Sequence, residues 1–275
     1  MLLGAQGQLG REIIRQFQEK HVLVPYPRET LDITNYQALE QAVFITQPDV
    51  VLNAAAYTNV EKAEDDVDSA FRVNALGAQN LALACRKNQA KLVHVSTDYV
   101  FDGTKEVPYE EFDLPNPLSV YGRSKLWGEK LIQSVGGAYF IVRTSWLYGD
   151  GRNFVRTMLQ LAAQKNKLTV VRDQYGTPTF TKDLVWVIAQ LMETDFYGIY
   201  HASNQGSCSW FEFAQKIFEY TGQAVQVEAV SSEAFPVKAT RPKHSVLENR
   251  LLRLRGLDIM RPWEEALQDY LGGTP

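Results

Sequence analysis

The residues best suited to chemistry are Tyr121 and Lys125, four positions apart. From about Val120 the chain follows a helical pattern, and this spacing places both side chains on one helix face. A free tyrosine has a pKa of about 10 and is a weak acid–base catalyst at neutral pH. Because a nearby cation favours the phenolate, we expect Lys125 to lower the pKa of Tyr121. Such a pair can give a proton to a carbonyl oxygen while a hydride reaches the carbonyl carbon.

A hydroxyl that could share this work is expected in the strand that precedes the helix. Residues 92–97 read as a buried strand that ends in Ser96 and Thr97. A hydroxyl at that end can hydrogen-bond a substrate carbonyl oxygen beside the tyrosine. A Ser-Thr pair is by itself commonly part of a turn. Together with Tyr121 and Lys125, Thr97 forms a candidate catalytic set.

The N-terminal residues are the first of the elements that must position this set. Residues 1–3 are apolar, Gly4, Gly7 and Gly10 follow, and an amphipathic helix is expected to about Lys20. Glycines at a strand-to-helix turn let the backbone approach a pyrophosphate at the helix N-terminus. The spacing differs from the Gly-x-Gly-x-x-Gly dehydrogenase fingerprint. We predict a dinucleotide-binding turn at these three glycines.

The next segments would form the walls of the dinucleotide site. Residues 21–24 are predicted as the second strand, and no acid follows it to take a ribose 2′-hydroxyl. Arg28 either faces a 2′-phosphate, which favours NADP, or is an exposed loop residue. Thr34 or Asn35 is expected to cap a helix to about Thr46.

A buried strand at residues 48–53 ends in small residues, which let a cofactor lie close. One long helix is predicted from residue 65 to 88, and Asn74 inside it is either exposed or a buried brace. Residues 138–143 read as a further core strand, and Trp146 leaves its carboxyl end. Its indole either covers the apolar face of a deoxysugar or lies in the core. Arg241, in a loop rich in cations, either meets nucleotide phosphates or is solvated.

Alternating strands and helices predict an α/β fold: a Rossmann-like, doubly wound parallel sheet with a smaller C-terminal substrate-binding lobe. We assign residues 1–147 to a dinucleotide-binding domain, to which residues 178–204 return. Residues 148–177 and 205–275 would form the nucleotide-sugar-binding lobe. A net charge of -4 without a basic run argues against a nucleic-acid partner. Two isolated cysteines and the absence of a long apolar run predict a cytoplasmic protein without a membrane partner.

Eight runs then show a resemblance, at residues 4–12, 53–58, 96–103, 121–125, 143–149, 153–154, 173–179 and 241–242. In these runs the chain resembles the extended short-chain dehydrogenase/reductases, and most closely the dTDP-4-dehydrorhamnose reductase (RmlD) family. The resemblance implies reduction of the 4-keto group of dTDP-4-dehydro-6-deoxy-L-mannose to dTDP-L-rhamnose by NADPH or NADH, with NADPH favoured. The partner would be a dTDP-keto-deoxysugar, and the protein a monomer or homodimer.

The resemblance, together with the interpretations above of the glycine turn, Arg28 and Arg241, implies roles for individual residues. The catalytic residues would be Thr97, Tyr121 and Lys125. The cofactor would be bound by Gly4, Gly7, Gln8, Leu9, Gly10, Arg28, Asp32, Ile33, Ala55, Ala56, Tyr57, Ser96, Tyr121 and Lys125. The substrate would be bound by Thr97, Asp98, Tyr99, Tyr121, Trp146, Asn153 and Arg241.

Two features depart from the family pattern. The first strand is short, and Glu12 matches only one of the glutamates with which some members hold Mg²⁺ at a dimer interface. We therefore predict no metal site, although the family leaves Mg²⁺ open.

Two other functions stay open. An epimerase or dehydratase could use the same scaffold, although a dehydratase would require acidic residues beside Thr97, and Tyr99 follows Asp98. A non-catalytic, NADP-binding regulatory subunit could also use this fold, as does the similar regulatory subunit of methionine adenosyltransferase. The complete Thr97, Tyr121 and Lys125 set favours an enzyme.

Overall fold

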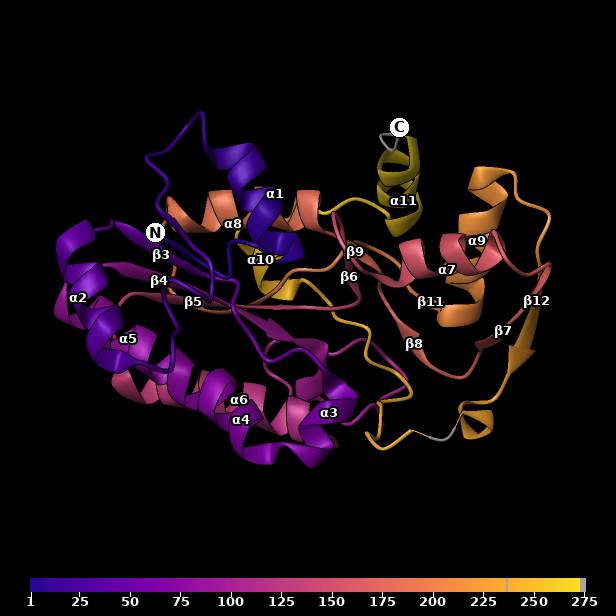
Figure 1. Cartoon of the computed structure of the whole chain (residues 1–275), viewed down its shortest axis with the longest axis horizontal. Coiled ribbons are helices and arrows are strands. Elements are labelled where there is room, and N and C mark those ends of the chain that lie inside the picture. Colours follow the sequence, from indigo (N-terminus) through magenta and orange to yellow (C-terminus); the bar gives the residue numbers. More distant parts are fainter. Residues whose placement is uncertain (236, 273–275) are drawn as a thin grey trace.

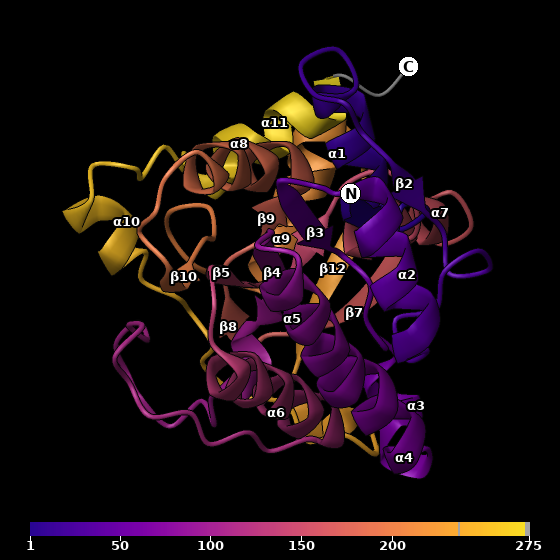
Figure 2. The same ribbon diagram turned by 90° about the vertical axis from the view of Figure 1, so that its left-hand side faces the viewer.

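The computed structural model describes residues 1–235 and 237–272. A parallel sheet with the strand order β10-β5-β4-β3-β1-β2 forms its centre (Figures 1 and 2). Its strands are β1 (Leu2–Leu3), β2 (Pro25–Tyr26), β3 (Val50–Asn53), β4 (Lys91–Thr97), β5 (Tyr139–Thr144) and β10 (Gly198–His201). The chain order reverses between β1 and β3, and ligands of such sheets bind outside the carboxyl strand ends at that point.

Helices cover both faces of this sheet (Figure 1). One face carries α1 (Gln8–Phe17), α8 (Thr181–Met192) and α10 (Arg250–Leu254). The other carries α2 (Tyr36–Thr46), α5 (Gly77–Lys87) and α6 (Val120–Val135). The sequence explains the packing of α1, because Leu9, Ile13 and Phe17 recur every four residues and are all buried. The prediction of a Rossmann-like, doubly wound sheet is confirmed.

The helix predicted over residues 65–88 is divided. It consists of α4 (Val67–Phe71), a π-helical turn (Arg72–Leu76) and α5, and a short helix α3 (Val60–Asp65) precedes it. Asn74 lies in the π turn and is 2% exposed, so the buried-brace alternative is correct. Its side chain accepts a hydrogen bond from the Tyr57 N–H (2.8 Å) and donates to Ser124 Oγ (2.9 Å). Asn74 thereby ties the loop after β3 to α6.

The second half builds a smaller region beside the sheet, on the right of Figure 1. It contains β6 (Leu147–Tyr148), α7 (Phe154–Ala162), β7 (Lys167–Val171), β8 (Tyr175–Gly176), β9 (Thr179–Phe180), β11 (Cys208–Ser209), α9 (Trp210–Thr221), β12 (Gln226–Val230) and α11 (Trp263–Gly272). Its strands pair two by two, and its helices bury Phe213 and Trp263 in a separate apolar cluster. The domain boundaries at residues 147, 178 and 204 remain a prediction.

The second strand was predicted four residues too early. Residues 21–24 are not a strand, and Val22 is 96% exposed. Pairing with the short β1 decides the position, because Leu2 lies opposite Pro25 and donates its N–H to the Val24 carbonyl. The predicted cap of α2 is correct, since Asn35 accepts a hydrogen bond from the Ala38 N–H.

In the described residues, no helix combines the length and apolar character required to cross a bilayer.

Candidate active site

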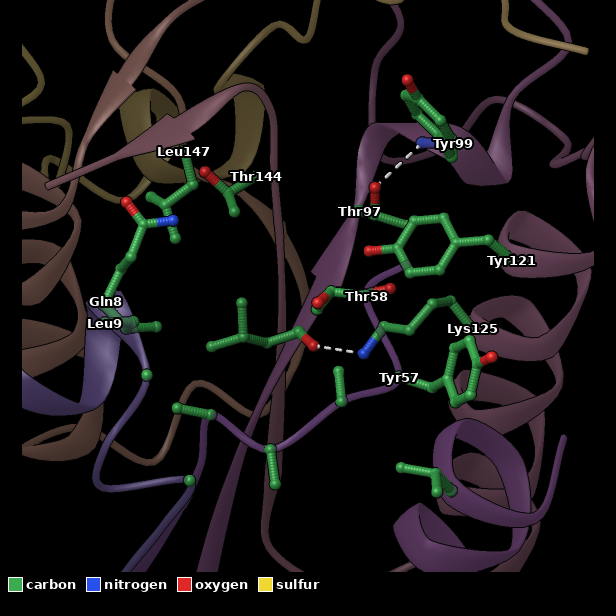
Figure 3. Close-up of a pocket in the computed structure, with 18 of the residues that line it drawn as sticks. Gln8, Leu9, Tyr57, Thr58, Thr97, Tyr99, Tyr121, Lys125, Thr144 and Leu147 are labelled. Atoms are coloured by element: carbon green, nitrogen blue, oxygen red, sulfur yellow. Dashed lines mark hydrogen bonds between the residues drawn. The ribbon is translucent and has the colours of Figure 1, made fainter. Parts of the chain in front are cut away.

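A pocket of about 810 Å³ lies at the carboxyl ends of the sheet strands. Figure 3 shows side chains from the N-terminal turn, the loop after β3, the end of β4 and α6 converging on it. The predicted residues that line it are Gly4, Gly7, Gln8, Leu9, Arg28, Asp32, Ile33, Ala55, Ala56, Tyr57, Ser96, Thr97, Asp98, Tyr99, Tyr121, Lys125 and Trp146. Three predicted residues, Gly10, Asn153 and Arg241, are not part of this lining.

The turn at Gly4, Gly7 and Gly10 forms a narrow space that side chains would fill. Gly4 has φ +74°, and a Cβ added there would lie 2.7 Å from the Ala54 and Ala55 backbone. A Cβ on Gly10 would lie 2.2 Å from the Gly4 carbonyl oxygen, so Gly10 permits close packing of α1 rather than ligand contact. Helix α1 begins after Gly7 without a side-chain cap, and Gln8 and Leu9 of the first turn line the pocket, an arrangement that suits a pyrophosphate.

Lys125 projects from α6 into the floor of the pocket and is 2% exposed. Its Nζ donates to the Val95 carbonyl oxygen at 2.6 Å, the contact drawn in Figure 3. Helix α6 begins beside the pocket because Ser119 caps it by accepting the Gly122 N–H. Burial lowers the pKa of Lys125 to about 8, and the carboxylate of Glu129 opposes that shift.

Tyr121 lies one turn before Lys125 and points toward Thr97 (Figure 3). The predicted lowering of its pKa is wrong for this ligand-free structure. Burial raises the pKa of Tyr121 to about 12, and a hydrogen bond with the Thr97 side chain acts in the opposite direction. The cause is desolvation of the phenolate, while the Lys125 amine is bonded to a backbone carbonyl instead.

Asp98 connects Thr97 to the C-terminal part of the chain. Thr97 Oγ1 donates to Asp98 Oδ1 at 3.0 Å, and Ser245 Oγ donates to Asp98 Oδ2 at 2.6 Å. Burial raises the pKa of Asp98 to about 6, although these hydrogen bonds favour its charged form. The ring of Tyr99 meets Tyr121 edge-on, with 5.7 Å between centroids. The Thr97 hydroxyl is therefore held in place beside Tyr121.

Ser96 has its hydroxyl turned toward α6, where it donates to Glu129 Oε1 at 2.5 Å. Arg143 of β5 forms an ion pair with the same carboxylate (2.6 Å), and both of these charged side chains are at most 2% exposed. This network fixes the distance between α6 and the two central strands.

Two tryptophans, Trp146 and Trp210, line the pocket. Trp146 has φ +45°, a strained value for a residue other than glycine, and stacks on Trp210 with 3.4 Å between centroids. A Cβ on Gly176 would lie 2.4 Å from the Trp146 ring. Trp210 was not predicted as a site residue, because no spacing relates it to Trp146. Pairing of β8 with β11 brings them together.

Thr144 was also missed, and its buried Oγ1 has no partner among the described residues.

Asn153 and Arg241 have other contacts. The Asn153 side chain accepts the Arg156 N–H and donates to the Gly149 carbonyl oxygen, so it caps α7. Arg241 forms an ion pair with Glu61 at 2.6 Å, and it also interacts with Tyr99, which lines the pocket. Direct substrate contacts by Asn153 and Arg241 stay predictions.

Two predicted charged positions have local partners. Arg28 lies at the pocket edge, 78% exposed, with Nε 3.9 Å from Asp32 Oδ2. The Glu12 carboxylate is bonded to Arg15 and Gln16. Within residues 1–235 and 237–272, no three His, Cys, Asp or Glu side chains are grouped so as to hold a metal ion.

Comparison with known proteins agrees with this site. Residues 1–274 match the model of the RmlD substrate binding domain family. A dTDP-4-dehydrorhamnose reductase from Mycolicibacterium smegmatis is 41% identical over 280 residues, covering 100% of this chain and 85% of its own length.

Two solved structures are similar over almost the whole chain. A Clostridium acetobutylicum dTDP-4-dehydrorhamnose reductase has a TM-score of 0.97 and 46% identity, and covers 98% of this chain and 97% of its own. A Bacillus anthracis dTDP-4-dehydrorhamnose reductase in complex with NADP has a TM-score of 0.98 and 45% identity, and covers 99% and 98%. The resemblance predicted from the sequence is confirmed, and the chain belongs to the RmlD substrate binding domain family.

Proposed function

We propose that this protein is a dTDP-4-dehydrorhamnose reductase, which reduces the 4-keto group of dTDP-4-dehydro-6-deoxy-L-mannose with a nicotinamide dinucleotide. The observation that carries the proposal is that Thr97, Tyr121 and Lys125 line the same pocket as the glycine turn. The solved relatives from Clostridium acetobutylicum and Bacillus anthracis are both named dTDP-4-dehydrorhamnose reductase, and these names support the same reaction.

The pocket residues fit a dinucleotide. The turn at Gly4 and Gly7 and the start of α1 would hold the pyrophosphate, and Ala55 and Ala56 leave room for the adjoining ribose. Thr144 also lines the pocket, and its Oγ1 has no hydrogen-bond partner among the described residues. When bound, the dinucleotide supplies the hydride.

The protein's own residues would manage the proton. With a pKa of about 12, Tyr121 stays protonated at neutral pH and therefore holds the proton that the developing alkoxide requires. Thr97, whose hydroxyl donates to Asp98 in this structure, would turn that proton to hydrogen-bond the same oxygen. The ammonium of Lys125, one helical turn away, would stabilise the phenolate that Tyr121 becomes. The stacked Trp146 and Trp210 would exclude water and offer an apolar wall to the deoxysugar.

NADPH is the favoured cofactor because Arg28 lies at the pocket edge, where its guanidinium can meet a 2′-phosphate. The NADP complex of the Bacillus anthracis relative supports this preference. Substitution Arg28→Ala is expected to raise the KM for NADPH about tenfold while changing that for NADH little. Equal changes for both dinucleotides would argue against the preference.

The test of the function is oxidation of NADPH on addition of freshly prepared dTDP-4-dehydro-6-deoxy-L-mannose. We expect substrate-dependent oxidation that falls by about 10²- to 10⁴-fold in Tyr121→Phe. A matched control is Tyr139→Phe, which removes a hydroxyl on β5 outside the pocket lining. Near-normal turnover by Tyr121→Phe would refute the role of the tyrosine. Dinucleotide binding without oxidation would favour a binding module.

A further inference from the structure

The side of Lys125 that faces away from the pocket meets a buried polar chain that the mechanism above does not use. Asn53, the last residue of β3, lies opposite His94 of β4 in the sheet. Their exposed fractions are 2% and 1%. His94 Nε2 is 3.2 Å from Lys125 Nζ, and His94 Nδ1 is 2.9 Å from Asn53 Nδ2. A buried imidazole thus stands between an amide and the catalytic amine.

The backbone decides which of these groups donates. The N–H of Ala55 can only donate, and it does so to Asn53 Oδ1 at 3.1 Å. The other end of the Asn53 amide is therefore the NH₂ group, which donates to His94 Nδ1. Nδ1 must then be the unprotonated nitrogen of the ring.

The proton of the neutral imidazole consequently lies on Nε2 and points at Lys125. His94 is neutral, because its complete burial lowers its pKa well below its ordinary value. An ammonium has three N–H bonds and no lone pair, so it cannot accept this hydrogen bond. A neutral amine can accept it and still donate to the Val95 carbonyl oxygen.

We propose that Asn53 and His94 are positioning residues that favour the neutral amine of Lys125 in the ligand-free protein. The pair acts on the reaction through Lys125, without touching the reacting atoms. The chemical consequence, though not the geometry, rests on the proposed function. The hydrogen bond from His94 would oppose formation of the Lys125 ammonium, which is the cation that stabilises the Tyr121 phenolate. Lys125 would therefore lose its charge at a lower pH than a free lysine does.

The other charged groups around the amine are few. On α6, Glu129 favours the ammonium, but its carboxylate is already paired with Arg143 of β5. Tyr57, Tyr121 and Asp98 line the open side of the pocket. Burial of the amine acts in the same direction as the His94 pair. Of these groups, Glu129 is the one that opposes the neutral amine.

The first experiment is on the ligand-free wild-type protein. Long-range ¹H–¹⁵N NMR correlations distinguish the two histidine tautomers, and we expect His94 to carry its proton on Nε2. A proton on Nδ1 would overturn the proposal, because His94 would then accept from an ammonium.

The second experiment measures the pKa of Lys125 by ¹³C NMR of labelled lysines, with the signal assigned by its loss in Lys125→Met. Substitution His94→Phe keeps a ring but removes the donor, and we expect the proton affinity of Lys125 to rise about tenfold, the size of one net hydrogen bond. Substitution Asn53→Leu removes the amide donor and so permits the other His94 tautomer. This substitution should also raise the proton affinity of Lys125. The control Leu92→Ala alters the same strand and should leave the Lys125 titration unchanged.

An unchanged or decreased proton affinity in His94→Phe would refute the proposal. Neither experiment requires cofactor or substrate. If the wild-type protein fails to reduce the keto-sugar but these shifts are observed, the proposed function fails and the role of His94 stands.

Discussion

The buried carboxylate of Glu129 offers the sharpest test of how the site is held in place. It accepts hydrogen bonds from Arg143 Nε and Nη2 and from Ser96 Oγ, and it is 1% exposed. Substitution Glu129→Gln keeps the volume of the side chain but removes its charge. The guanidinium of Arg143 then loses its ion-pair partner, and it keeps contacts with the neutral His201 and the ring of Phe101. The buried Glu111 carboxylate interacts with it electrostatically but forms no ion pair with it among the described residues.

The expected loss follows from that geometry. Breaking a buried ion pair by removing one partner costs about 3–5 kcal/mol. The glutamine oxygen can still accept one hydrogen bond, so we expect a decrease of about 3 kcal/mol in the free energy of unfolding. With an unfolding entropy of about 2.1 cal/mol/K per residue, a chain of 275 residues would lose about 5 °C in Tm.

Urea unfolding followed by circular dichroism and tryptophan fluorescence measures this loss. The control is Glu219→Gln, which breaks the exposed pair with Lys216 and should cost less than about 0.5 kcal/mol. The double variant Glu129→Gln/Arg143→Met removes both charges, so its loss should be smaller than the sum of the two single losses. If Glu129→Gln costs no more than the surface control, the buried pair does not hold α6 against the sheet.

Three further predictions concern activity and binding. Because burial lowers the pKa of Lys125 to about 8, kcat/KM should decline as pH rises through about 8, where the ammonium is lost, while Tyr121 stays protonated. Substitution Gly10→Ala places a Cβ 2.2 Å from the Gly4 carbonyl oxygen, so NADPH affinity in a fluorescence titration should fall at least about tenfold. Substitution Trp210→Ala removes the ring stacked on Trp146, so the KM for the sugar should rise about fivefold with a smaller change in kcat.

Specific results would contradict each of these. A pH profile that stays level to about pH 10 would mean that the lysine charge is not required. Unchanged NADPH affinity in Gly10→Ala would mean that the turn tolerates displacement of α1. A Trp210→Ala variant that loses only kcat would place the tryptophan pair in the chemical step, rather than in binding of the sugar.

Local features of this protein were predictable from the sequence, because neighbouring residues determine them. The four-residue spacing of Tyr121 and Lys125 puts both on one face of α6, and Asn35 caps α2 whatever lies around it. The family motifs likewise led to most of the pocket lining, since the runs at residues 4–12, 53–58, 96–103 and 143–149 lie at the ends of strands β1, β3, β4 and β5 of the sheet. The position of β2 was not predictable, because it depends on its register with β1.

The tertiary structure alone decided the electrostatic state of the site and several of its contacts. Burial raises the pKa of Tyr121, against the expected direction, because desolvation depends on the whole surrounding fold. Trp210 reaches Trp146, and His94 reaches Lys125, across long separations in the chain. The cap that Asn153 provides to α7 was likewise not predicted. The sequence determines which groups are present and which neighbours they have along the chain, whereas desolvation and pairing arise only when distant segments pack together.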